Sequence, residues 1–233
     1  MSDCFSAQVI QRATLIGLDD CGRIPATGLT AIKGLEDGLI TVGRTHNVTQ
    51  ATDNTVKTVN GKSCTKQRGC PTDSGYTYTL TFCGNNIAAQ ALAGLVKLDL
   101  DAGGNVIGYE DTKFSCPLPM ALEIIFKPLA ATSCAAGATA QCRAMIVPYL
   151  TSWATSGDET YNADTTPDLV MTGETVVSKN LFANFANAAA LPAFLSHWGP
   201  KFADIGTGRA WSYNRMVTCP AASNGDPCAI VAL

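Results

Sequence analysis

Charged side chains, histidines and long apolar runs are all scarce in this chain of 233 residues. Charged residues make up 15% of it, and lysine and arginine occur as scattered singles rather than as a basic block. Binding to double-stranded DNA is driven largely by the release of counterions when a cluster of cations contacts the phosphates. The sequence has no such cluster, which disfavours tight nucleic-acid binding. The best apolar candidate, residues 181–195, contains Pro192 and falls short of the roughly 20 residues that a membrane-spanning helix needs. We therefore expect no membrane insertion.

The shortage of histidine also limits catalysis. Only His46 and His197 are present, and neither lies in a recognisable motif. A serine or cysteine hydrolase needs a nucleophile, a histidine and a third group that orients it, and the G-x-S-x-G elbow is missing. Phosphate-binding loops of the G-x-x-x-x-G-K-[ST] or G-x-G-x-x-G type are missing as well. We expect no enzymatic activity, no catalytic residue and no bound cofactor.

The composition is typical of an ordered protein that assembles. Hydrophobic residues reach 46%, the formal net charge is −3, and a surface of low charge tends to associate. Residues 1–15 are polar and mixed, without the charged segment and apolar core of a secretory leader. We therefore expect synthesis in the cytoplasm. No linker or repeat divides the chain, so we expect a single domain over residues 1–233.

Cysteine, by contrast, is abundant, with ten residues. Disulfides are the leading interpretation, and free structural thiols or a metal site are the alternatives, although the C-x2-C spacing of zinc sites does not occur. Bridges in a protein made in the cytoplasm require that it act outside the cell that made it, as a virion protein released by lysis does. Three local pairs would close short loops: Cys64 with Cys70, Cys134 with Cys142, and Cys219 with Cys228.

The stretch 61–96 gives the clearest structural signal. Tyr76, Tyr78, Leu80 and Phe82 alternate with threonines and Cys83, which is typical of a strand packed on one face. An aromatic stripe of this kind can stack bases, but without flanking cations a core face is the favoured interpretation. Apolar residues then recur at helical spacing over 87–95, after an asparagine that can cap the helix.

Further strands are predicted along most of the chain. Residues 120–127 alternate cleanly, and 144–150 is the expected partner strand. The polar stretch 46–60 is predicted to be an exposed loop or an arm that reaches a neighbour. Residues 181–197 are expected to form a helix or an ordered loop, and 22–30 a loop. The remaining predicted strands are 12–18, 39–44, 97–100, 106–109, 169–177 and 211–218. The pattern indicates a mainly β protein, a sandwich or partly closed barrel flanked by one α-helix.

One segment has the spacing of a calcium loop. Asp99 and Asp101, followed by Gly104 and Glu110, match positions 1, 3, 6 and 12 of a twelve-residue loop. Positions 5 and 9, Gly103 and Ile107, supply no side-chain oxygen, and a strand is predicted where the exiting helix should start. The favoured interpretation is a glycine-rich hairpin turn with no metal, and the calcium site is the alternative.

The order of these features resembles that of the major tail proteins, or tail tube proteins, of long-tailed bacteriophages with non-contractile tails. The resemblance covers residues 12–177, and 181–233 matches less clearly. It rests on the succession Asp20-Cys21-Gly22, Asp37-Gly38, Asn60-Gly61-Lys62-Ser63-Cys64, Gly69-Cys70, the aromatic strand into Phe82-Cys83, the helix, Gly104-Asn105-Val106-Ile107-Gly108-Tyr109, and Trp198-Gly199.

The resemblance implies a tail tube fold whose hexameric rings stack into the tube that conducts the genome during ejection, with localisation in the virion tail. Implied partners are further copies of the chain, the tape measure, tail terminator and distal tail proteins, and DNA in non-specific passage; an acidic chain suits such passage. It also implies an inter-ring loop with candidate residues His46, Thr49, Asp53, Asn54 and Thr55. The rival expectations are another virion or surface β-module, for capsid decoration or adhesion, and a secreted hydrolase.

Overall fold

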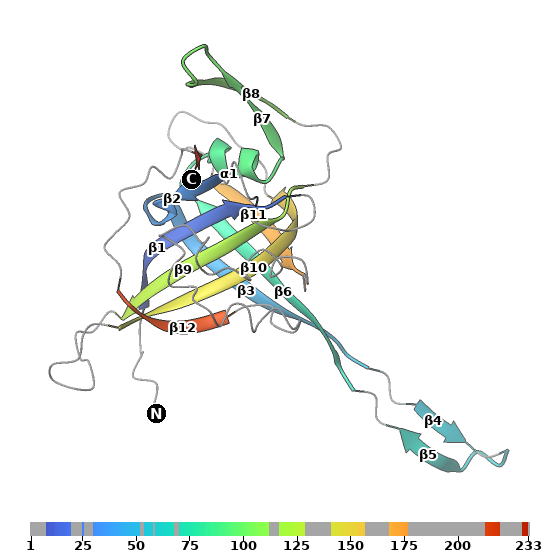
Figure 1. Cartoon of the computed structure of the whole chain (residues 1–233). Helices are drawn as coiled ribbons and strands as arrows, with labels where there is room; N and C mark the ends of the chain where they lie inside the picture. Colours follow the sequence, from blue (N-terminus) through green and yellow to red (C-terminus); the bar gives the residue numbers. More distant parts are fainter. Residues whose placement is uncertain are drawn as a thin grey trace, which may run out of the picture.

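A computed structural model describes residues 8–19, 25, 30–51, 54–57, 59–67, 70–111, 117–128, 141–156, 168–176, 213–219 and 230–232. The described chain is mainly β, with a curved antiparallel sheet, a short α-helix against one end of it and two hairpins that project from it (Figure 1). The predicted mainly β class with one helix is therefore confirmed. The described sheet is open rather than a closed barrel, because no ladder joins its two terminal strands.

The described chain contains the following helices and strands, given in chain order. They are β1 (Gln8–Gly17), β2 (Thr30–Lys33), the 3-10 helix η1 (Leu35–Asp37), β3 (Leu39–Thr49), β4 (Asn54–Lys57), β5 (Ser63–Gln67), β6 (Thr72–Phe82), α1 (Ile87–Leu92), β7 (Val96–Leu100), β8 (Val106–Asp111), β9 (Met120–Pro128), β10 (Gln141–Ser156), β11 (Leu169–Thr175), β12 (Tyr213–Thr218) and β13 (Val231–Ala232).

Nine strands form the main sheet, in the order β13-β2-β1-β9-β10-β11-β6-β3. β12 pairs with β10 beside this path, along residues 141–146 of β10, and β11 pairs with the later part of the same strand. The predicted pairing of 120–127 with 144–150 is confirmed by the β9–β10 ladder. β3 and β13 are the terminal strands of this order, and the two hairpins β4–β5 and β7–β8 are separate ladders.

One face of the sheet carries the main hydrophobic core. Tyr78, Leu80 and Phe82 of β6 are fully buried there, as their alternation predicts, together with Leu122 and Ile124 of β9. The aromatic stripe is therefore a core face rather than an exposed stacking surface. Alanines and a leucine of α1 close this core, and the helix contacts β1, β2 and β7.

Helix α1 is shorter than its sequence pattern predicts. Its start is the predicted one, because the Asn86 carboxamide oxygen accepts a hydrogen bond from the Ala89 amide at 3.0 Å. Its end comes before Leu95, because Gly94 adopts a left-handed φ of 72° and the Leu95 amide donates back to the Gln90 carbonyl. Within the described residues, no helix has the length and apolarity needed to cross a membrane.

The opposite face of the sheet is also covered. Arg12 Nη2 lies 3.0 Å from Glu123 Oε1, and the Glu123 side chain is fully buried. A small second cluster contains Ile125, Cys142 and Ala144, with Cys219 against it. A protein with two packed sheet faces needs apolar side chains at both alternating positions of its central strands, which β9 and β10 have.

Candidate functional site

Strand β3 forms one edge of the main sheet. It is eleven residues long, and it pairs with β6 on one side and with no other described strand. Most of its described residues are exposed, and Ile40 is half exposed, at 50%. A long edge strand presents a row of unpaired backbone groups to which another chain can add a strand. This edge is therefore suited to association with another polypeptide.

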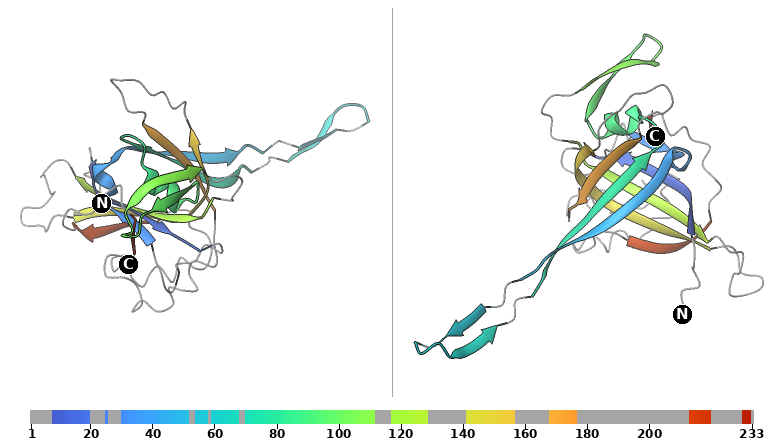
Figure 2. Two further views of the ribbon diagram at one scale, coloured as in Figure 1. Left: turned by 90° about the horizontal axis from the view of Figure 1, so that it is seen from above. Right: turned by 180° about the vertical axis from the view of Figure 1, so that it is seen from behind.

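Strands β3 and β6 continue beyond the sheet as a two-stranded ribbon. Their ladder reaches Thr49 opposite Thr72, whereas the neighbouring strand β11 pairs with β6 only as far as Thr77. The hairpin β4–β5 continues the ribbon, so that the whole segment projects well away from the body (Figures 1 and 2). We call residues 46–76 the arm. The predicted excursion at 46–60 is therefore an arm rather than a loop.

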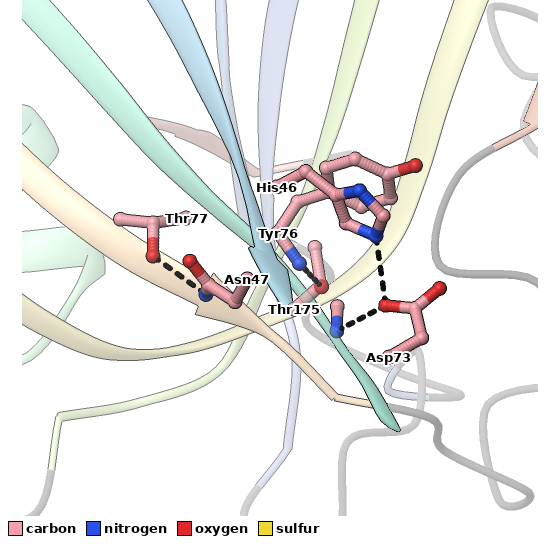
Figure 3. Close-up of polar contacts among 7 residues, drawn as sticks. His46, Asn47, Asp73, Tyr76, Thr77 and Thr175 are labelled. Carbon is pink, nitrogen blue, oxygen red and sulfur yellow. Dashed lines mark hydrogen bonds and ion pairs between the residues drawn. The ribbon is translucent and has the colours of Figure 1, made fainter. Parts of the chain in front are cut away.

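A cluster of polar and aromatic side chains holds the root of the arm (Figure 3). His46 of β3 lies opposite Tyr76 of β6, and their rings stack with centroids 4.7 Å apart. His46 Nε2 is also 3.0 Å from Asp73 Oδ1. The Arg44 guanidinium sits over the Tyr76 ring, 4.5 Å from its centroid. These contacts tie the two strands together where the rest of the sheet no longer supports them.

A hydrogen bond from β6 to β11 joins the root of the arm to the body. The Tyr76 amide donates to Thr175 Oγ1 at 2.7 Å, and Thr175 is almost fully buried (Figure 3). Asn47 Nδ2 donates to Thr77 Oγ1 at 2.9 Å across the ribbon. The ribbon therefore leaves the sheet from a fixed point.

A β-bulge lies just beyond this point. The register between β3 and β6 shifts between His46 and Val48, and Gly75 adopts a φ of 95° in the bulged strand. The Gly75 amide donates to the Asp73 carboxylate at 2.9 Å. This bond, and then the hydrogen bond to His46, lower the pKa of Asp73 from its usual value of 3.8. Asp73 is therefore a stable anion at neutral pH.

The tip of the arm is basic and bears an exposed apolar side chain. The segment 54–67 contains three lysines and no carboxylate. Lys57 and Lys62 are exposed on either side of the tip turn, and Val59 between them is fully exposed. The described residues of the tip are therefore exposed and include two cations and one apolar side chain.

The β7–β8 hairpin contains the predicted calcium-loop residues. Asp101 Oδ1 accepts hydrogen bonds from the amides of Gly103 and Asn105, both at 2.8 Å, and holds a tight turn. These bonds, with that of the Asn105 carboxamide as the largest cause, lower the pKa of Asp101. Glu110 lies on β8, where a calcium loop would need a helix, and opposite Lys97 rather than Asp101. The predicted glycine-rich hairpin turn is present, and the described residues contain no cluster of three side chains that could hold a metal ion.

The predicted inter-ring residues are divided between two parts of the arm. His46 and Thr49 lie on β3, and Asn54 and Thr55 lie on β4. Asp53 lies outside the described residues, as does His197. The side chains of Asn54 and Thr55 lie outside the described part of the structure, and His46 links β3 to Asp73.

The predicted local disulfide pairs are wrong where the structure describes them. Cys142 and Cys219 form one bridge with each other, across a sequence separation of 77, instead of pairing with Cys134 and Cys228. Cys70 is an exposed free thiol, so it does not pair with Cys64. The side chain of Cys64, like Cys134 and Cys228, lies outside the described part of the structure. Strand pairing between β10 and β12 brings the two bridged residues together, which spacing along the chain could not show.

Sequence reasoning missed Arg44, Asp73 and Thr175 as residues of the arm's root. Their partners are far away in the sequence, since 99 positions separate Tyr76 from Thr175. The one available signal was the Asp73-Ser74-Gly75 turn composition, which marks a bend without naming a partner.

Comparisons of this chain with protein-family models, curated proteins and solved structures found no match.

Proposed function

We propose that this chain is a structural virion protein, the major tail protein of a long-tailed bacteriophage with a non-contractile tail. In this proposal the chain forms hexameric rings that stack into a tube, and the tube conducts the genome during ejection. The order of sequence features from residue 12 to residue 177 supports the assignment, as does a mainly β sheet flanked by one helix. Its role is mechanical rather than catalytic.

The observation that carries the proposal is the arm. A tube of stacked rings needs a contact along its axis, and a rigid extension from each subunit is a direct way to make one. The arm leaves the sheet at a fixed root, extends far beyond the body, and ends in an exposed tip (Figure 2). Maintaining such an extension costs conformational entropy that its own few contacts hardly offset, which favours a role in assembly.

A tube also needs contacts around each ring. The long edge strand β3 supports such a contact, because adding a strand from a neighbour satisfies its free backbone groups. The repeat of one sheet edge against another generates a closed ring when the rotation per subunit closes. The other proposed partners are the tape measure, tail terminator and distal tail proteins, with DNA passing without specific contacts.

The arm can be removed without disturbing the core. Thr49 and Thr72 lie directly opposite each other, so an Asn-Gly dipeptide can replace residues 50–71 as a two-residue hairpin turn. All residues of this segment whose burial is described are exposed. The shortened chain should therefore keep its melting temperature and its β circular dichroism, and it should form rings that no longer stack. Tubes of normal length from the shortened chain would refute the role of the arm.

A further inference from the structure

The turn at the tip of the arm exposes an asparagine that is followed by a glycine. Asn60 and Gly61 lie between β4 and β5, and both are exposed, as are Val59 and Lys62 beside them. Gly61 has a φ of 76°, and, apart from its chain neighbours, no heavy atom of the described structure comes within 4 Å of the position of a Cβ on it. Water therefore reaches the Asn60 side chain and the backbone that follows it.

The two reactive groups of this pair are also unrestrained. Within the part of the chain that the structure describes, no hydrogen bond holds the Asn60 carboxamide or the Gly61 amide. A glycine has no Cβ, so nothing on Gly61 blocks the approach of its backbone nitrogen to the preceding side chain. Asn60 and Gly61 therefore combine a free carboxamide with an accessible neighbouring amide.

Asn105 is the contrasting case at the tip of the β7–β8 hairpin. It is exposed as well, but its Nδ2 donates to Asp101 Oδ2 at 2.9 Å, and its backbone amide donates to Asp101 Oδ1 at 2.8 Å. The next residue is Val106, whose branched side chain crowds its own backbone. The two exposed asparagines therefore differ in restraint and in the residue that follows.

The chemistry open to Asn60 is attack on its own side chain. The Gly61 nitrogen forms a bond to Asn60 Cγ, and the bond from Cγ to the side-chain nitrogen breaks. This nitrogen leaves as ammonia, carrying the proton that the Gly61 amide gives up. Water then opens the resulting five-membered succinimide ring at either carbonyl. The products are aspartate, and isoaspartate, in which the main chain runs through the side-chain carbon.

We propose that Asn60 is a site of spontaneous deamidation in the folded chain. Aspartate places a carboxylate in the segment 54–67, which has none, between Lys57 and Lys62. Isoaspartate adds one carbon to the backbone of the turn that joins β4 to β5. Chains that have aged therefore carry a different arm tip from newly made chains. This inference concerns the chemistry of the turn alone and does not depend on the proposed virion role.

Peptide mapping by mass spectrometry measures the reaction. Trypsin cleavage after lysine gives the peptides 58–62 and 98–113, which contain Asn60 and Asn105 as their only asparagines. After incubation of the dilute folded chain in mildly alkaline buffer, Asn60 should be converted at least about tenfold faster than Asn105, a difference of about 1.4 kcal/mol in barrier. The folded chain should convert Asn60 within about threefold of the rate in urea, because the fold gives this turn no protection.

A matched pair of glycine variants tests the direct attack. Gly61→Ala adds a methyl group to the attacking residue, and the structure has room for it. It should slow conversion of Asn60 about tenfold. Gly104→Ala is the control, because Gly104 also has a positive φ and open space around it but follows no asparagine. This control should leave the rate at Asn60 unchanged, and circular dichroism checks that both variants fold.

Three results would overturn the proposal. The first is equal conversion of Asn60 and Asn105 in the folded chain. The second is an Asn60 that stays intact in the folded chain while the chain in urea converts it. The third is an unchanged rate at Asn60 in the Gly61→Ala variant, which would exclude attack by the Gly61 nitrogen.

Discussion

His46 Nε2 lies 3.0 Å from Asp73 Oδ1 and so joins β3 to β6 at the point where the ribbon leaves the sheet. The Tyr76 ring stacks on the same histidine, and the Tyr76 amide is bound to Thr175 of the body (Figure 3). The arm is therefore held at its root by side chains from β3, β6 and β11. The proposed stacking of rings depends on a root that keeps the arm extended.

The root should loosen in acid. Asp73 has a lowered pKa in the folded chain, so its stabilising contribution is present above the usual value of 3.8 and is lost as pH falls through its lower folded pKa. Asp73→Asn should remove this dependence. The measurement is an NMR titration of the Gly75 amide, which donates to Asp73, from neutral pH into acid. The control Asp37→Asn changes an exposed carboxylate in η1 and should leave the titration as it is. A Gly75 signal that titrates identically in Asp73→Asn would contradict this account.

The Cys142–Cys219 bridge should stabilise the sheet. Closing 77 residues of chain is worth about 4.5 kcal/mol in the chain-entropy model, and measured effects are typically about 2–4 kcal/mol. Cys142→Ala/Cys219→Ala should lower the free energy of unfolding by about 2–4 kcal/mol in non-reducing urea titrations. The matched control is Cys70→Ala/Cys83→Ala, which removes two exposed free thiols and should change little. Equal stability of both double variants would show that the bridge does not contribute.

Gly173 should not tolerate a larger side chain. A Cβ on Gly173 would lie 2.9 Å from ring atoms of Trp153, which is buried beside a bulge in β10. Gly173→Ala should therefore destabilise the protein by about 1–3 kcal/mol, because the indole has little room to shift. Gly43→Ala is the matched control, since its Cβ would meet Thr79 at an ordinary 3.5 Å. Thermal melting of the two variants checks this, and equal melting temperatures would contradict the close packing.

How much of this molecule its sequence predicts depends on where the stabilising contacts lie. Strands such as β6 and β9 have one face in the core, so alternation in the sequence identified them. The Asn86 cap is local, and it was predictable for the same reason. Strand β2, with four residues, was missed because so short a strand has too few alternating positions.

The sequence predicted the position of the arm, but it did not predict that the arm is built from paired strands. Beyond Arg44, the described side chains of β3 are largely exposed on both faces, so no apolar alternation marks this part as a strand. Backbone pairing with β6 and the contacts of His46 hold it instead. The Cys142–Cys219 bridge likewise depends on the pairing of two distant strands, which residue spacing does not reveal.

The ion pair between Arg12 and Glu123 gives a further test of packing on the sheet face opposite the main hydrophobic core. Glu123 is fully buried and lies 3.0 Å from Arg12, so Arg12→Met should remove a cation that stabilises the buried carboxylate. We expect a loss of about 3 kcal/mol in the free energy of unfolding. The double variant Arg12→Met/Glu123→Met removes both charges and should recover much of that loss. Urea titrations that find the double variant no more stable than Arg12→Met would refute the pairing.

Electron microscopy of the purified wild-type chain tests the central claim most directly. The protein should form long hollow tubes of stacked six-fold rings at low ionic strength, and the chain shortened at residues 50–71 should form rings alone. Monomers, or solid fibres without a channel, at every concentration of wild-type protein would contradict the tail tube role.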